Sequence, residues 1–246
     1  MSSKHLFIAF IIIALLGAGG YFWAAEKKQA AVEKAVRTWQ EGSIEYLSFD
    51  YKAVNSRLWD NTITLEHVQV TYPVLMSINE VQVNPTLENN ILEDLYINAH
   101  GVNFTVPSMT ENQPWQGDLI VDYVYDPDLK EVDLYFAPDF PGLLVGELET
   151  SFVNITPSVD IIFNYTDILL QELHLELQNE GLIKSESVIA WANTLNNTQQ
   201  RDAFNNFVQN QQTLNIKFVP EYPVAIHRLL ESPMIFWQHP AVEVNS

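Results

Sequence analysis

The chain contains no cysteine among its 246 residues. This absence excludes disulfides, thiolate chemistry and lipid attachment at an N-terminal cysteine, so the fold depends on an apolar core. Basic residues are also scarce, with 12 Lys and Arg against 31 Asp and Glu, and only five of the 12 lie beyond residue 57. Because such an acidic chain repels phosphate backbones, we expect no nucleic acid partner.

Catalytic and cofactor motifs are missing as well. The sequence has no Gly-x-Ser-x-Gly, phosphate-binding or dinucleotide-binding motif. Its six histidines are scattered, and no pair has the spacing of two metal ligands on a helix. We therefore predict a protein that is not an enzyme, with no catalytic residue, no cofactor and no metal site.

The densest acidic segment leaves two alternatives open. It comprises Asp118, Asp122, Asp126, Asp128, Glu131, Asp133 and Asp139. Asp126 and Asp128 offer oxygen ligands to calcium, although the glycine and the terminal glutamate of an EF-hand loop are absent. A hydrolase that pairs two of these carboxylates is the second alternative. The alternation of the carboxylates with Leu, Val and Tyr favours the solvated face of a hairpin.

Residues 6–23 form an uncharged apolar run that ends at Tyr21, Phe22 and Trp23. At about 1.5 Å per residue, a helix of this length crosses the hydrocarbon core of a bilayer. We expect residues 1–23 to be a cytoplasmic tip and a transmembrane anchor that contacts membrane lipid. A signal peptide cleaved near the glycines at 17–20 is the alternative.

Residues 24–42 predict a helical stalk that ends at Gly42, because residues 24–41 contain neither Gly nor Pro. Val32, Val36 and Trp39 form a narrow apolar stripe on it, and they are the candidate interaction residues. The stripe fits either a partner helix or the chain's own domain, and the second interpretation is favoured.

The distribution of positive charge leaves the orientation open. Lys27, Lys28 and other basic residues follow the span, which by the positive-inside rule would place the C-terminal part in the cytoplasm. We favour export, because an uncleaved signal anchor translocates long domains largely regardless of charge. The expected location is the bacterial inner membrane, with a single span and a periplasmic C-terminal domain.

From residue 43 onward the apolar period changes to two, which predicts strands. The alternation slips by one position at Glu66 and His67, and similar slips occur before Val81 and around His100 and Gly101, which indicates either β-bulges or strands that change face. Further predicted segments are a hairpin with its turn at 126–130 and strands at 144–155, 159–165, 169–177, 214–218 and 242–244. Pro73, Pro85 and Pro107 are expected to close the early strands.

Helical periods return near residues 185–211, with a second start at Thr198, and near 223–238. The predicted fold class is α+β. It has an N-terminal transmembrane helix and stalk, followed over residues 43–246 by one β-rich soluble domain. In that domain a few C-terminal helices pack on a long curved antiparallel meander.

The anchor, the slipping strands and the segment 214–224, in which a strand ends in Pro220-x-x-Pro223 before a helix, resemble a known group. The chain is similar to single-span bacterial envelope proteins of the YdgA-like and AsmA-like kinds. The resemblance implies a periplasmic, non-enzymatic role near envelope lipid or protein assembly, and it transfers no functional residues. A pilin shares the helix-stalk-head layout, but its cleavage motif and the acidic residue in its apolar helix are absent here.

Two functions remain open besides the hydrolase. The favoured one is binding or shielding of an apolar ligand, such as lipid or an outer-membrane component, by the β-rich domain. The alternative is a scaffold that recruits an envelope protein through the stalk stripe or a sheet edge.

Overall fold

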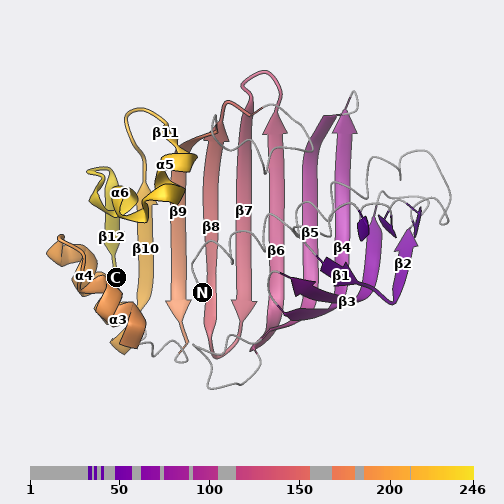
Figure 1. Ribbon diagram of the computed structural model, residues 1–246, viewed down its shortest axis with the longest axis horizontal. Helices are drawn as coiled ribbons and strands as arrows, with labels where there is room; N and C mark the ends of the chain where they lie inside the picture. The colour runs from indigo at the N-terminus through magenta and orange to yellow at the C-terminus, as the bar shows by residue number, and fades with distance from the viewer. Residues whose placement is uncertain are drawn as a thin grey trace. The chain divides into compact units, whose positions relative to one another are not determined.

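The computed structural model describes residues 33–34, 36–37, 40–41, 48–56, 62–72, 75–88, 91–104, 115–155, 168–180, 186–210 and 212–246 (Figure 1). These residues form 12 strands in antiparallel pairs and a few short helices, so the predicted antiparallel meander is confirmed. The chain divides into two compact units, residues 1–124 and 125–246. The expected single domain over 43–246 stays a prediction.

The predicted anchor at residues 6–23 lies outside the described residues. Within the described ranges, no helix is long and apolar enough to cross a bilayer.

Unit 1 is built from strands that follow one another in the sheet. They are β1 (Ser48–Asp50), β2 (Ala53–Ser56), β3 (Ile63–Tyr72), β4 (Met76–Glu88), β5 (Ile91–Phe104) and β6 (Trp115–Asp126). β1 and β2 both pair with β3, and β3 to β6 pair in sequence order. Alternating Val, Ile and Leu side chains of β3 to β6 are almost fully buried, so one face of the sheet contributes to a core.

A line of irregularities crosses β3, β4 and β5, and we call it the crease. In the register, His67 of β3 lies opposite Asn79 of β4, and Asn79 lies opposite Gly101 of β5. His67 and Gly101 have positive φ angles of 51° and 62°. Val68 and Val81, just beyond the slips, are buried like the apolar residues before them. At the crease the register between β3 and β4 and between β4 and β5 is unbroken, whereas the register between β5 and β6 shifts between Ala99 and Val102. The predicted bulge is therefore confirmed at residues 100–101 of β5, and the bulges predicted in β3 and β4 are wrong.

The prediction that Pro85 closes a strand is wrong. β4 continues to Glu88, and Pro85 is paired with Leu95 of β5. The last pair between β3 and β4 joins Ile63 to Val83. Pro85 thus lies past the end of β3, where its missing N–H interrupts no pairing with that strand. Pro73, Pro107 and the predicted strand at 159–165 lie outside the described residues.

Unit 2 contains the remaining strands and the helices described from residue 186 onward. The strands are β7 (Glu131–Phe140), β8 (Leu144–Val153), β9 (Leu169–Asn179), β10 (Thr213–Phe218), β11 (Val224–Ala225) and β12 (Val242–Asn245). β7, β8, β9, β10 and β12 are neighbours in this order, and β11 pairs with β9. The helices are α3 (Glu186–Ala192), α4 (Thr198–Asn210), α5 (Ile226–Glu231) and α6 (Pro233–Gln238). The predicted helices near 185–211 and 223–238 are confirmed.

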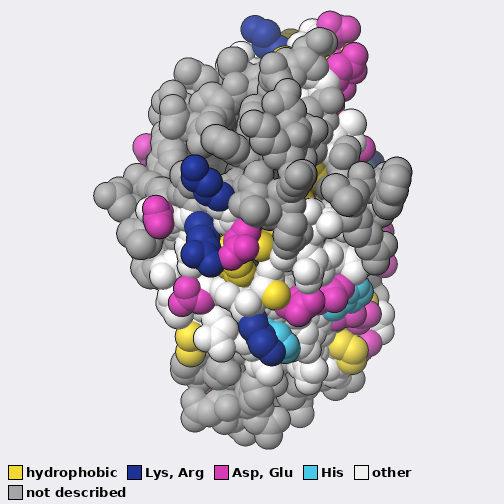
Figure 2. Space-filling view, turned by 90° about the vertical axis from the view of Figure 1, so that its right-hand side faces the viewer, with side chains coloured by type: hydrophobic (Ala, Val, Ile, Leu, Met, Phe, Trp, Pro, Cys, Tyr) yellow, Lys and Arg dark blue, Asp and Glu magenta, His cyan; other side chains and the backbone are white. Residues whose placement is uncertain are grey.

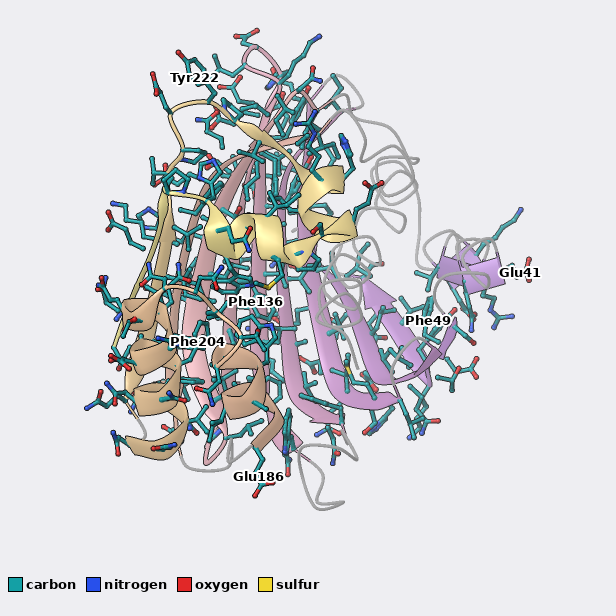
Figure 3. All side chains as sticks on the ribbon, turned by 60° about the vertical axis from the view of Figure 1, so that its left-hand side comes forward. Glu41, Phe49, Phe136, Glu186, Phe204 and Tyr222 are labelled. Atoms are coloured by element: carbon teal, nitrogen blue, oxygen red, sulfur yellow. The ribbon has the colours of Figure 1, made fainter. Side chains whose placement is uncertain are left out.

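The helices pack on one face of β9, β10 and β12 through an aromatic cluster. Trp237 of α6 makes edge-to-face contacts with Trp191 of α3 and Phe204 of α4, at centroid distances of 5.2 and 5.4 Å. Phe204 lies where α4 meets the sheet (Figure 3). Phe218 of β10 is fully buried and contacts Phe236 of α6. Such ring pairs add specificity to a core because their geometry is directional.

The end of the predicted stalk is helical where it is described, at residues 33–34, 36–37 and 40–41. Arg37 forms an ion pair with Glu33 at 2.7 Å, as expected for residues four apart on a helix. Gln40 donates a hydrogen bond to the backbone oxygen of Phe49 in β1. This bond ties the end of the helix to the first strand of unit 1.

Candidate functional site

The apolar face of unit 2 is organised in rows that run across the strands. In one row, Phe136 of β7 pairs with Leu148 of β8, which pairs with Leu175 of β9. In the next row, Leu134 pairs with Thr150, and Thr150 pairs with Leu173. Directly paired residues project from the same face, so the aliphatic side chains form one surface. We call Leu134, Leu148, Leu173 and Leu175 the leucine row.

The leucine row continues the core beyond its helical cover. At the β10 end, Leu175 and Leu173 pair with Ile216 and Phe218, which are 5% and 0% exposed. The four leucines themselves are only half-buried. In Figure 1, α3 to α6 lie over β9 to β12, and none of these four helices covers β7 or β8. Leu134 and Leu148, in β7 and β8, therefore lie beyond these helices, whereas Leu173 and Leu175 of β9 pack against the core beneath them.

Gly146 of β8 shows how closely the strands approach on this face. A Cβ atom at this position would lie 2.2 Å from the backbone oxygen of Glu176 and 2.9 Å from the side chain of Leu177. Only glycine fits there, and its missing side chain leaves room for Leu177.

The opposite face of β8 and β9 is acidic. Glu147 pairs with Glu176, and Glu149 pairs with His174. Glu147, Glu149 and Glu176 are exposed. The sheet is thus amphipathic, with a solvated acidic face and an apolar face that also bears the helices.

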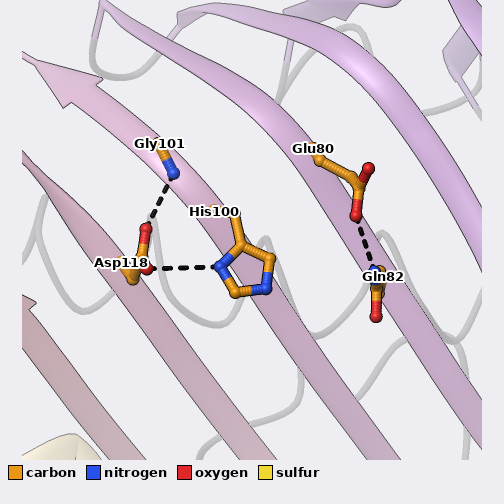
Figure 4. A network of polar contacts seen from close by, with 5 residues as sticks. All are labelled: Glu80, Gln82, His100, Gly101 and Asp118. Atoms are coloured by element: carbon orange, nitrogen blue, oxygen red, sulfur yellow. Dashed lines mark hydrogen bonds and ion pairs between the residues drawn. The ribbon is translucent and has the colours of Figure 1, made fainter.

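A polar network occupies the exposed face of unit 1 at the crease (Figure 4). The Gly101 N–H donates to Asp118 Oδ1 at 2.8 Å, and His100 Nδ1 lies 3.2 Å from Asp118 Oδ2. On β4, Gln82 donates to Glu80 at 2.6 Å. The Gly101 N–H, followed by His100, lowers the pKa of Asp118.

This network fits a structural role better than a catalytic one. The His100 and Asp118 side chains are 45% and 51% exposed, so water competes with the contact between them. Asp118 instead accepts the N–H that the bulge at Gly101 exposes.

Two other acidic residues of the 118–139 segment accept hydrogen bonds within the fold. Asp126 accepts the N–H groups of Asp128 and Leu129 and so closes the predicted turn at 126–130. Asp133 accepts a hydrogen bond from Ser151 of β8. In the part of the chain that the structure describes, no group of three or more His, Cys, Asp or Glu side chains could hold a metal ion.

The predicted interaction stripe is only partly described. Val36 is 3% exposed, which leaves almost no apolar surface for a partner at this position. Val32 and Trp39 lie outside the described residues.

On the side of the molecule shown in Figure 2, basic and acidic side chains lie beside one another. The leucine row was not singled out from the sequence, although the alternation in 169–177 contained two of its members.

Known proteins give no further guide to this site. No protein-family model matches the chain, and no curated protein matches its sequence. The resemblance to YdgA-like and AsmA-like proteins therefore stays a prediction.

Proposed function

We propose that the chain is a non-enzymatic, membrane-anchored protein of the bacterial envelope whose β-rich part binds or shields the acyl chain of a lipid. The observation that carries this proposal is the leucine row, which extends the apolar face of unit 2 beyond its described helices and is half-buried.

The chemistry of the surface favours an uncharged, elongated apolar ligand. The row is made of Leu side chains and contains no charged group, so it offers dispersion contacts and burial. Each methylene group transferred from water to such a surface contributes about 0.8 kcal/mol. The glutamates on the opposite face repel anionic headgroups, so we expect the acyl chain alone to occupy the row.

The membrane anchor and the compartment belong to the same proposal. Support comes from the uncharged run at residues 6–23, whose length suits a bilayer. A periplasm-specific reporter fused after Ser246 of the full chain is expected to be active. A reporter that is active only in the cytoplasm would contradict the proposed location.

Site-specific photo-cross-linking in the membrane tests the ligand. A photoreactive amino acid replaces Leu148 in the full chain, and in a second strain it replaces the neighbouring Glu149, which projects from the acidic face. We expect mass spectrometry of the irradiated protein to find lipid adducts at position 148 and few at position 149. Because both positions lie in β8, the comparison separates the row from lipid that surrounds the anchor.

A substitution within the leucine row completes the test. Leu175→Gln introduces an amide into the row and is expected to reduce the lipid adduct at position 148 several-fold. The exposed control Glu176→Gln should leave the adduct unchanged. Equal lipid adducts at positions 148 and 149, or adducts with protein alone, would overturn the proposal.

A further inference from the structure

A hollow in unit 2 lies between α4, α6 and β12. Its volume is about 350 Å³, which is at the lower end of the range for small-molecule sites. Its lining residues are Leu195, Asn196, Asn197, Gln200, Met234, Trp237, Gln238, His239, Pro240 and Val242.

The lining contains no Asp, Glu, Lys or Arg, although the chain has a net charge of −19. Its one titratable side chain is His239, whose Nδ1 accepts the N–H of Ala241 at 3.2 Å. This bond occupies the Nδ1 atom of the ring. A charged ligand would lose its hydration without gaining a counter-charge here, so the hollow favours a neutral one.

Amide side chains give the hollow both donors and acceptors. Asn197 Oδ1 accepts the N–H of Gln199 at 2.9 Å, which leaves its Nδ2 group as a donor. Gln200 is 3% exposed, and its Nε2 donates to the backbone oxygen of Trp237 at 3.2 Å, which leaves Oε1 as an acceptor. Such a mixture matches hydroxyl groups, because each hydroxyl both donates and accepts.

Trp237 adds a rigid apolar surface to these polar groups. Its ring is held by edge-to-face contacts with Trp191, Phe204 and Phe236, at centroid distances of 5.2, 5.4 and 4.9 Å. A ring fixed before binding loses little conformational entropy when a ligand packs against it. The C–H face of a sugar ring is an apolar surface of suitable size, and its hydroxyl groups lie at the edge.

We infer that this hollow is a binding site for a neutral sugar ring. The inference is independent of the leucine row and of the membrane anchor. It is tested on the full chain, purified in a polyoxyethylene detergent, because a glycosidic detergent would itself supply sugar.

The probes are glucose and N-acetylglucosamine, with glucuronate as the charged comparator and uridine as a neutral ring of another class. Tryptophan fluorescence and saturation-transfer NMR report binding. For at least one neutral sugar we expect a dissociation constant on the order of 1 mM or below. Glucuronate and uridine are expected to bind more weakly than that sugar.

Asn197→Asp is the decisive variant. Aspartate keeps the oxygen that caps α4 but removes the Nδ2 donor, so the fold should be retained while the affinity falls on the order of tenfold. The matched control is Asn193→Asp, which makes the same change at an exposed position outside the hollow. Thermal unfolding verifies that both variants are folded.

Three results would overturn the inference. They are the absence of neutral sugar binding to the folded chain, binding of glucuronate or uridine at least as tight as that of the sugars, and equal affinities of the Asn197→Asp variant and the wild type. Loss of lipid cross-linking at position 148 would leave the inference untouched, so its failure is distinguishable from failure of the proposed function.

Discussion

At the scale of single residues, the pKa values of Asp118 and Asp122, both in β6, are shifted in opposite directions. The Gly101 N–H lowers the pKa of Asp118, whereas burial, and secondarily Asp94, raises the pKa of Asp122. Ionised Asp118 therefore stabilises the fold above its ordinary pKa, and this stabilisation is lost as the pH falls through the lowered value. Ionised Asp122 costs stability at neutral pH, and the cost disappears as the pH falls through the raised value.

We predict that near neutral pH, Asp118→Asn lowers the free energy of unfolding and Asp122→Asn raises it. Each change should be about 0.5 kcal/mol, because both groups are partly solvated and screening reduces their interactions. Urea unfolding of the full chain at several pH values measures the effects. The increase in the free energy of unfolding caused by Asp122→Asn should become smaller as the pH falls toward 3.8, the ordinary pKa of an aspartate. A change of the same sign in both variants would contradict this account.

His67 links the residue scale to the scale of the element. Its φ angle of 51° is unfavourable for most side chains, yet β3 adopts it where the strand crosses the crease. We predict that His67→Val lowers the free energy of unfolding by about 1–2 kcal/mol, because a β-branched residue avoids this backbone conformation.

The matched substitution is His67→Asn, since asparagine adopts positive φ more readily. It should change stability by less than about 0.5 kcal/mol. Equilibrium denaturation of the two variants provides the comparison. Equal losses in both would show that the imidazole side chain matters at this position, and not the backbone conformation.

At the scale of elements, the sequence predicted strands and helices better than it predicted their ends. Alternation identified β9 and β10, and the turn at 126–130 and the helix start at Thr198 were confirmed. The prediction for Pro85 was wrong because a missing N–H destabilises a strand only where a neighbouring strand would accept its hydrogen bond. Pro85 is paired with β5 but lies past the end of β3. That neighbour is determined by long-range register, which no local pattern contains.

The candidate site was less predictable than the elements. Alternation places Leu148 and Leu175 on an apolar face but does not show which strands the helices cover. The hollow beside Trp237 combines residues from α4, α6 and β12, and its lining residues have no common spacing in the sequence. Histidines and acidic residues, which drew attention in the sequence, hold a bulge and a turn instead.

At the scale of the whole molecule, the dominant property is the net charge of −19. Like charges even face each other across strands, as in the pair of Glu147 and Glu176. We predict that the unfolding midpoint rises when NaCl increases from about 20 to about 300 mM, because salt screens repulsion that the compact state concentrates.

Glu176→Gln removes one member of that pair. It is expected to raise the free energy of unfolding by up to about 1 kcal/mol at low salt and to reduce the salt dependence. Thermal unfolding across a salt series measures both effects. A midpoint that falls with added salt would mean that attractive ion pairs outweigh the repulsion.

The sequence by itself determined the periods of the strands and helices, the positions where the apolar alternation slips and the acidic character of the chain, because these depend on residue type and short spacing. Only the tertiary structure decided which leucines lie beyond the helices and which amides surround Trp237. These residues come from segments that are far apart in the chain. Strand register and helix packing bring them together, and both depend on the sum of many weak contacts over the whole fold.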